Sequence, residues 1–191
     1  MFYDAQQDPL CYAGTRVLIN KADIREQADL DEFELSMYLS RATEPLPAGN
    51  LDYGHYRAIH HHLFQDVYDW AGEERTIRIA KGGSAFAYPE HLHRAMTRVF
   101  DDLAERNFLL DLDKVTFAEG AAYVLAEINA GHPFREGNGR TQLAFLKLLC
   151  VRSGHDFNDD ALDPDLTLNA MIASFRGDLA PLTALITALI D

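Results

Sequence analysis

Nine consecutive residues, 132–140, carry the groups in this chain that are best suited to phosphate chemistry. They read His-Pro-Phe-Arg-Glu-Gly-Asn-Gly-Arg. Glycine permits positive φ, so the backbone N–H groups of Gly137, Asn138 and Gly139 can turn toward one point and form an anion nest. A helix expected to begin at Asn138 adds unpaired N–H groups and the positive end of its dipole. The stretch therefore predicts a phosphate site that needs no lysine.

Three side chains in the same stretch complete a set for phosphate transfer. Glu136 offers carboxylate oxygens beside the nest, which suits Mg²⁺ bridging two phosphates. Arg140, in the first turn of the expected helix, can hold the leaving phosphates with its charged fork. His132 has an ordinary pKa of about 6.5 and can take a proton from an incoming hydroxyl. Alone, each of these residue types is more often structural, and only their combination within nine residues predicts catalysis.

The rest of the chain is mostly helical in pattern, which predicts an all-α fold. Asn50 is the expected N-cap of the second helix. Segment 114–130 is apolar on nearly every side, which is typical of a buried central helix, and the nine residues follow it directly. Apolar residues at helical spacing mark seven segments: 29–43, 51–69, 89–107, 114–130, 138–153, 164–176 and 178–190.

One segment has a different period. Residues 75–80, Arg-Thr-Ile-Arg-Ile-Ala, alternate polar and apolar side chains, which predicts a strand. Residues 81–84 then have the composition of a turn, and 85–88 can form a return strand. Two interpretations remain open for this hairpin: a surface loop, or an edge on which another chain docks by strand addition.

Composition excludes some classes of function. The 191 residues suffice for one domain with a real core. With 30 acidic and 17 basic residues, the net charge of −13 disfavours direct nucleic acid binding and binding to an anionic membrane. We expect no membrane span, because no apolar run approaches the ~20 residues required. The N-terminus lacks the features of a signal peptide, and the two cysteines are far apart, so we expect a reducing cytoplasm.

Two metal-site alternatives are weaker. The adjacent residues His60, His61 and His62 would point about 100° apart on a helix, so they cannot converge on one ion, with or without His55. The acidic run between residues 159 and 165 lacks the spacing and the glycine of a calcium loop. A solvated helix start is the preferred interpretation of that run.

In these nine residues the chain resembles the Fic family. Residues 132–140 match the signature His-x-Phe-x-[Asp/Glu]-Gly-Asn-Gly-Arg-x-x-Arg at every fixed position but the last. The resemblance to small bacterial Fic toxins covers nearly the whole chain, through residues 12–15, 20–21, 58–72, 81–86 and 127–129.

The resemblance implies a fold: an all-helical Fic core over residues 51–191, a segment and helix over 1–50 packed on it, and a β-hairpin flap (75–88) over the motif loop (132–143). It also implies transfer of AMP from ATP–Mg²⁺ to a Ser, Thr or Tyr hydroxyl of a target protein. His132 would be the general base and Glu136 the Mg²⁺ ligand. The remaining implied site residues fall into two groups: Lys81, Gly82, Asn129, Gly137, Asn138, Gly139 and Arg140 at the nucleotide, and Ile77, Arg78, Ile79 and Ala80 pairing with the target.

Partners and location follow from the same resemblance. At family level the expected target is a type II topoisomerase subunit, of gyrase or topoisomerase IV. The family's inhibitory motif, Ser/Thr-x-x-x-Glu-Gly/Asn, is absent from this sequence. This absence implies a toxin restrained by a separate small antitoxin. The expected location is the bacterial cytoplasm, with translocation into a host cell left open.

One departure keeps alternatives open. Leu143 stands where the family has its second arginine, which meets the γ-phosphate. The chain could therefore be a catalytically weakened Fic domain that acts as a binding module. It could also transfer another nucleotide or phosphate-containing group, because a backbone nest recognises phosphates and not the base. Gly139, where the related Doc kinases have lysine, favours nucleotidyl transfer.

Overall fold

The computed structural model describes residues 8–81 and 84–191, with backbone only for Lys81 and Ser84. Over this range the fold is all-α apart from one short antiparallel hairpin. Among these residues, no helix is long and apolar enough to cross a membrane. The elements are α1 (Gln27–Ala42), α2 (Tyr53–Phe64), β1 (Ala80–Lys81), β2 (Ser84–Ala85), α3 (Pro89–Glu105), η1 (Asn107–Leu109), α4 (Lys114–Gly131), α5 (Asn138–Arg152), η2 (Asp159–Ala161), α6 (Pro164–Phe175) and α7 (Ala180–Leu189).

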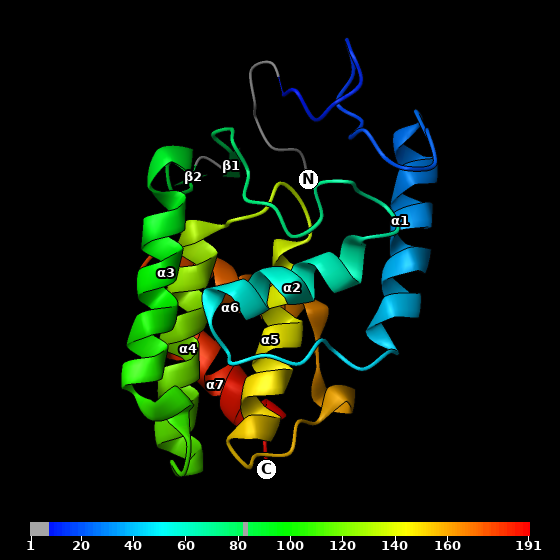
Figure 1. Ribbon diagram of the computed structural model, residues 1–191. Coiled ribbons are helices and arrows are strands. Elements are labelled where there is room, and N and C mark those ends of the chain that lie inside the picture. The colour runs from blue at the N-terminus through cyan, green and yellow to red at the C-terminus, as the bar shows by residue number, and fades with distance from the viewer. Residues whose placement is uncertain (1–7, 82–83) are drawn as a thin grey trace.

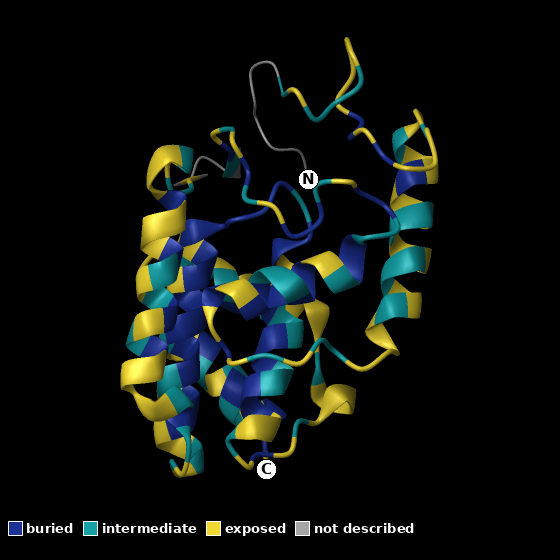
Figure 2. Ribbon diagram, in the orientation of Figure 1, coloured by how far each residue is buried: buried dark blue, intermediate teal, exposed yellow. Residues whose placement is uncertain are grey.

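The buried helix α4 lies at the centre and packs against α3, α5, α6 and α7. Figure 1 shows α3 and α1 on opposite sides of the bundle, with α2 crossing in front of α5. Most of α4 is dark blue in Figure 2, whereas the outer faces of α1 and α3 are exposed. The hairpin, residues 8–26 and the α4–α5 loop all lie at one end, opposite the C-terminus. The fold therefore gathers at one end the segments that the sequence assigned to chemistry.

The sequence explains both ends of α4. Asp113 caps its start, since one carboxylate oxygen accepts the N–H groups of Val115 and Thr116 at 3.0 and 3.1 Å. The helix ends at Gly131, where His132 takes a left-handed conformation (φ 49°, ψ 64°) and donates its N–H to the Ile128 carbonyl at 2.9 Å. This turn directs the chain out of the core and into the motif loop.

Aromatic rings hold α2, α3, α5 and the motif loop together. The Tyr56 ring of α2 lies with its centroid 5.4 Å from Phe100, 5.6 Å from Phe134 and 5.5 Å from Phe145. Tyr56, Phe134 and Phe145 are fully buried. Phe134, the third residue of the motif, is therefore a core residue.

The histidine His60 of α2 fastens the motif loop from the other side. Its ring is fully buried and stacks on Phe134 with centroids 3.7 Å apart. The backbone N–H of Gly72 donates to Nδ1 at 2.8 Å, so the ring proton lies on Nε2, which donates to the Glu136 carbonyl at 3.0 Å. Burial lowers the pKa of His60 to about 3, so the ring stays neutral. His60 thus connects α2, the turn at Gly72 and the loop.

Six predicted helices are confirmed with ends within two residues. The second also starts within two residues of its predicted start, but its predicted N-cap and its predicted end were wrong. The structure has Asp52, not Asn50, as N-cap: its carboxylate accepts the His55 N–H at 2.7 Å. Leu51 has positive φ (59°), so the chain enters the helix only after it. The helix stops at Phe64 rather than 69, because the chain turns there, with the N–H groups of Val67 and Tyr68 both donating to the Phe64 carbonyl.

The strand predicted over residues 75–80 is also mostly wrong. Only Ala80 and Lys81 pair, with Ala85 and Ser84. Residues Ile77, Arg78 and Ile79 lie outside the strand, although the Phe86 N–H donates to the Ile79 carbonyl at 3.2 Å. The side chain of Arg75 takes the Ile77 and Ala87 carbonyls at 2.8 and 2.6 Å, so a buried guanidinium joins the two arms at the base of the hairpin.

The buried hydroxyl of Tyr56 yields a stability prediction. This oxygen has no hydrogen-bond partner among the described residues, and burial raises the pKa of Tyr56 well above its ordinary value. An unsatisfied buried group costs about 1–3 kcal/mol, so Tyr56→Phe should leave the free energy of unfolding unchanged or raise it by about 1 kcal/mol. Tyr56→Ala should lower it by about 3–5 kcal/mol, because it opens a cavity among three rings. Urea denaturation measures both, and a clear loss in Tyr56→Phe would contradict the assignment.

The double hydrogen bond of His60 yields a second prediction. His60→Leu should lower the free energy of unfolding by about 2–4 kcal/mol, because it strands the Gly72 N–H and the Glu136 carbonyl in the interior. His60→Gln, which keeps a donor and an acceptor, should lose less. Chemical denaturation at pH 7.5 compares the two variants. Equal losses would show that the His60 ring stabilises the fold by packing and not through its two hydrogen bonds.

Candidate active site

The motif loop joins the end of α4 to the start of α5, and its residues are mostly buried. His132 is 7% exposed and caps α4 in the left-handed region. Left-handed backbone is unfavourable for a residue with a side chain and persists where the surroundings enforce it. The Phe86 ring, just after β2, stacks on the imidazole with centroids 3.9 Å apart and planes 18° apart. The imidazole is thus held in one orientation, directly beneath the hairpin.

Of the two glycines of the motif, only Gly137 has positive φ, whereas Gly139 is in the first turn of α5. Gly137 is left-handed (φ 79°, ψ 2°) and is the N-cap of α5, which has no side-chain cap. A Cβ on Gly137 would meet the Phe64 ring at 2.4 Å, so no other residue fits. A Cβ on Gly139 would meet no described atom within 4 Å. The space beside the Gly139 Cα is therefore open.

The side chain of Asn138 has a structural role that the sequence did not indicate. Its side chain is 2% exposed, accepts the Phe134 N–H at 3.0 Å and donates to the Phe134 carbonyl at 2.8 Å. The amide thus closes the loop on itself. The backbone of Asn138 is the part that remains for a nucleotide.

Glu136 and Arg140 are neighbours. The Glu136 carboxylate accepts the Gly137 N–H at 2.9 Å, lies 3.6 Å from the Arg140 guanidinium and is 34% exposed. Such a carboxylate, next to an open helix start, fits the common Mg²⁺ arrangement of one protein carboxylate with phosphates and water.

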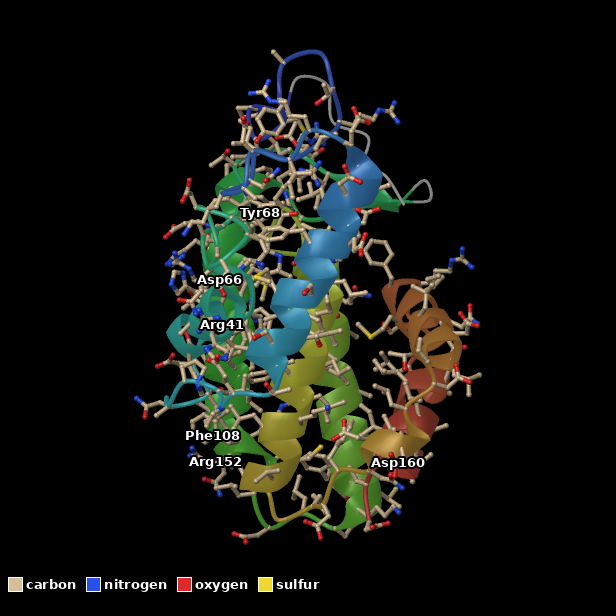
Figure 3. The ribbon with its side chains drawn as sticks, turned by 90° about the vertical axis from the view of Figure 1, so that its right-hand side faces the viewer. Arg41, Asp66, Tyr68, Phe108, Arg152 and Asp160 are labelled. Carbon is tan, nitrogen blue, oxygen red and sulfur yellow. The ribbon has the colours of Figure 1, made fainter. Side chains whose placement is uncertain are left out.

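Arg140 has a second acidic partner that the sequence did not indicate. Its guanidinium donates to Glu34 of α1 at 2.5 Å and lies over the Phe64 ring at 4.6 Å. Tyr68, labelled beside the N-terminal half of α1 in Figure 3, donates its hydroxyl to the same Glu34 carboxylate. Burial, then the Glu34 charge, raises the pKa of Tyr68. Arg140 is thus oriented before any phosphate arrives.

Arg135, the other arginine of the motif, is also held by a residue far away in the sequence. Arg135 donates to Asp8 at 2.5 Å in an ion pair whose side chains are 8% and 5% exposed. Asp8 itself accepts the Leu10 N–H at 2.9 Å. The segment before α1 therefore reaches the motif loop directly.

The remaining predicted site residues are not all brought together. Asn129 is buried and donates to the Met171 carbonyl of α6 at 3.0 Å, so its amide serves helix packing. Lys81 is in β1 by its backbone, and Gly82 lies outside the described residues. Of the predicted docking residues, Ile79 is buried, Arg78 is exposed with its guanidinium 3.7 Å from the Tyr88 ring, and Ala80 begins β1.

Sequence reasoning missed four residues that organise the site: Glu34, His60, Tyr68 and Arg75. Arg75 was visible as a charge inside the predicted strand, and His60 as a polar residue on an apolar helix stripe. Nothing local marked Glu34 or Tyr68, whose partners lie 106 and 34 residues away in the chain.

Comparisons with known proteins agree with this geometry. Residues 50–150 match the model of the Fic/DOC family. The chain is 55% identical over 189 residues to a Sinorhizobium fredii protein named probable protein adenylyltransferase y4lH, covering 98% of each chain. It is 31% identical to the probable protein adenylyltransferase Fic of Escherichia coli, covering 97% of this chain and 93% of the relative.

Solved structures share the fold. The BepC effector protein of Bartonella tribocorum with bound AMPPNP superposes with a TM-score of 0.84 at 26% identity, over 96% of both chains. The N-terminal Fic domain of a Bartonella quintana effector with bound ADP gives a TM-score of 0.85 at 26% identity, over 96% of this chain and 94% of that one. From the motif, the fold and these full-length matches, the chain belongs to the Fic/DOC family.

Proposed function

We propose that the chain transfers AMP from ATP–Mg²⁺ to a hydroxyl side chain of a target protein, with His132 as general base. By its family and its full-length relatives, the enzyme is a protein adenylyltransferase. One observation supports the assignment of residues most strongly. The oriented His132 ring, the Glu136 carboxylate and the uncapped start of α5 with Arg140 all belong to one rigid loop.

The reaction assigns each group one task. The target hydroxyl oxygen attacks the α-phosphorus, and the bond from that phosphorus to the pyrophosphate oxygen breaks. The hydroxyl proton moves to the His132 imidazole, a contribution typically worth about 10²–10⁴ in rate. The first-turn N–H groups of α5 and the Arg140 guanidinium hold the phosphates. Bound Mg²⁺, held by Glu136, would neutralise charge on the leaving pyrophosphate.

Nucleotide-bound relatives support the donor class, since BepC binds AMPPNP and the Bartonella quintana domain binds ADP. The backbone nest recognises phosphates and not the base, so transfer of another nucleotide or phosphate-containing group is the second candidate. Gly139, where the related Doc kinases have lysine, favours nucleotidyl transfer.

The same proposal includes a docking role for the hairpin. Residues Ile77, Arg78, Ile79 and Ala80 lead into β1, next to Phe86 and therefore next to the imidazole. Strand addition to a hairpin so close to His132 would bring a hydroxyl of the target to the base. Lys81 and Gly82 at its turn would then lie toward the nucleotide. A type II topoisomerase subunit is the first target to test.

A separate small antitoxin is the proposed regulator, acting in the bacterial cytoplasm. Its support is the missing inhibitory motif in this chain. A second support is the apolar exposure of α1, where Leu35 and Leu39, one turn apart, are 51% and 53% exposed. A helix carrying a glutamate could cover this face.

The central prediction concerns His132 and Glu136. His132→Ala should abolish transfer and leave MgATP binding intact, because the imidazole acts on the proton and not on the phosphates. Glu136→Ala should weaken nucleotide binding in Mg²⁺ and have little effect without it. Intact mass of purified gyrase and topoisomerase IV subunits, after incubation with MgATP, reports the gain of one AMP, and calorimetry reports binding. Transfer by His132→Ala at the parent rate would remove this residue from the mechanism, and affinity of Glu136→Ala unchanged in Mg²⁺ would remove the metal role.

Leu143 tests the alternative of a weakened enzyme. It lies on α5 one turn after Arg140 and is only partly buried, so an arginine there need not bury its charge. Leu143→Arg should accelerate single-turnover transfer by about 10–100-fold if a charged contact to the terminal phosphate forms in the transition state. Melting temperature is measured on the same sample. A stable variant with an unchanged rate would mean that other contacts orient the donor.

A further inference from the structure

A buried guanidinium lies where the hairpin meets the motif loop. Arg75, which precedes the hairpin, is 2% exposed. Its guanidinium donates to four backbone carbonyls, two on the motif side and two on the hairpin side. It donates from Nε to the His132 carbonyl at 2.7 Å, from Nη2 to the Gly131 and Ala87 carbonyls at 3.0 and 2.6 Å, and from Nη1 to the Ile77 carbonyl at 2.8 Å.

The motif-side bonds complete the end of α4. The last carbonyls of a helix have no partner within it and need external donors. Arg75 supplies donors to Gly131 and to His132, and the N–H of Ala87 supplies one to the Ala130 carbonyl at 3.2 Å. A cation at this end is also favoured by the helix dipole. Arg75 therefore acts as a C-cap contributed from outside the helix.

This cap holds the unfavourable conformation of the base. His132 has φ 49° and ψ 64°, and such strain persists only where neighbouring groups over-determine it. Arg75 fixes the peptide planes on both sides of that residue, through the Gly131 and His132 carbonyls. Its own backbone N–H donates to the next carbonyl, that of Pro133, at 2.9 Å.

The hairpin-side bonds of Arg75 fix the hairpin that is proposed to dock the target. Ile77 lies before β1 and Ala87 after β2, so one guanidinium joins both arms of the hairpin. Phe86, adjacent to Ala87, is the residue whose ring stacks on the imidazole. The position of the hairpin and the direction of the His132 ring are therefore set by a single side chain.

We propose that Arg75 is a positioning residue for adenylyl transfer: it fixes the position of the catalytic imidazole relative to the target-docking hairpin. The role rests on the proposed function of His132. It requires arginine, because a planar fork with five donors can reach four carbonyls, whereas the compact ammonium of lysine cannot. A residue that merely stabilised the fold would act on the whole bundle and not selectively on this junction.

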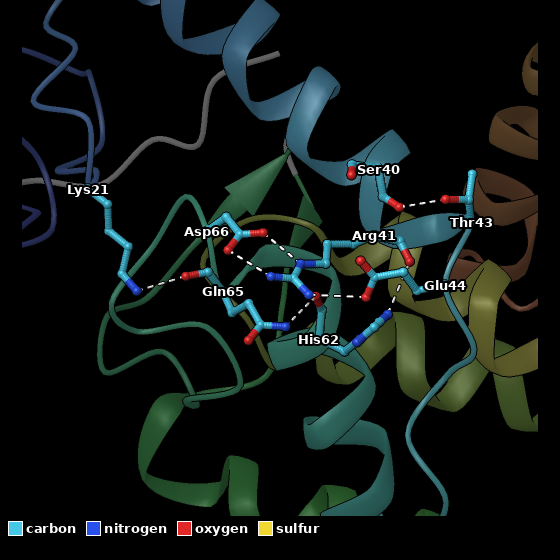
Figure 4. Close-up of polar contacts among 8 residues, drawn as sticks. All are labelled: Lys21, Ser40, Arg41, Thr43, Glu44, His62, Gln65 and Asp66. Carbon is cyan, nitrogen blue, oxygen red and sulfur yellow. Dashed lines mark hydrogen bonds and ion pairs between the residues drawn. The ribbon is translucent and has the colours of Figure 1, made fainter.

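The test compares Arg75→Met and Arg75→Lys with a matched control, Arg41→Met. Arg41 at the end of α1 is also held by a fork, with bonds of 2.6 and 2.9 Å to Asp66, away from the motif loop (Figure 4). Three quantities are measured: amide hydrogen exchange, MgATP affinity by calorimetry, and single-turnover transfer from MgATP to the acceptor that the parent enzyme modifies. Exchange needs no acceptor, so it decides the structural role even if the assigned chemistry of His132 fails.

In Arg75→Met we expect faster exchange at the amides of Ala87 and His132, with unchanged protection in the middle of α4. Transfer should fall about 100-fold, as small misplacements of catalytic groups do, while MgATP affinity stays at the parent value. Arg41→Met should lower the melting temperature without these local effects. Arg75→Lys should lie between the parent and Arg75→Met, and it decides the question if Arg75→Met does not fold.

Two results would overturn the proposal. One is parent-like exchange at Ala87 and His132, with parent-like transfer, in a folded Arg75 variant. The other is a loss of protection spread evenly over α4, as in a general destabilisation, with transfer reduced only in proportion to the unfolded fraction.

Discussion

The end of α4 is the constraint on which the site depends. The helix is buried in the centre of the bundle, so its axis cannot move without disturbing the core. It stops at Gly131, and the left-handed turn at His132 sends the chain across the top of the bundle. Two residues later, Phe134 returns to the interior between the rings of Tyr56 and His60. A helix end and a core anchor on either side of Pro133 leave the loop almost no freedom.

The arginines near the motif loop are held in place in a molecule whose net charge is negative. At a net charge of −13, the surface repels a polyphosphate at long range. The cationic side chains near the loop are held by partners of two kinds: carboxylates hold Arg140 (Glu34) and Arg135 (Asp8), and backbone carbonyls hold Arg75. Their conformational entropy is lost on folding and not on nucleotide binding. This preorganisation is what electrostatic stabilisation of a transition state requires.

The N-terminal part of the chain contributes to this arrangement. Asp8 and Glu34 both precede residue 50, where the match to the family model begins. Each nevertheless reaches an arginine of the motif loop. Changes before α2 can therefore alter the orientation of groups assigned to phosphate binding, although no such residue belongs to the motif. The boundary of the family match at residue 50 therefore does not separate two groups of residues that are electrostatically independent.

The sequence alone determined the features that depend on neighbours in the chain. Helical spacing located α3–α7, and the nine motif residues carried their own glycines, acid, base and helix start. Tertiary structure decided what depends on distant partners. Alternation at 75–80 predicted a strand, but the paired strand begins only at Ala80, and the buried Arg75 joins the two arms of the hairpin through the Ile77 and Ala87 carbonyls. The side-chain amides of Asn129 and Asn138 bond to the Met171 carbonyl and to the backbone of Phe134, pairings that the sequence did not indicate. Glu34, Asp8 and His60 meet the loop across 106, 127 and 76 residues, and no local pattern encodes such pairings because only the packed core brings those segments together.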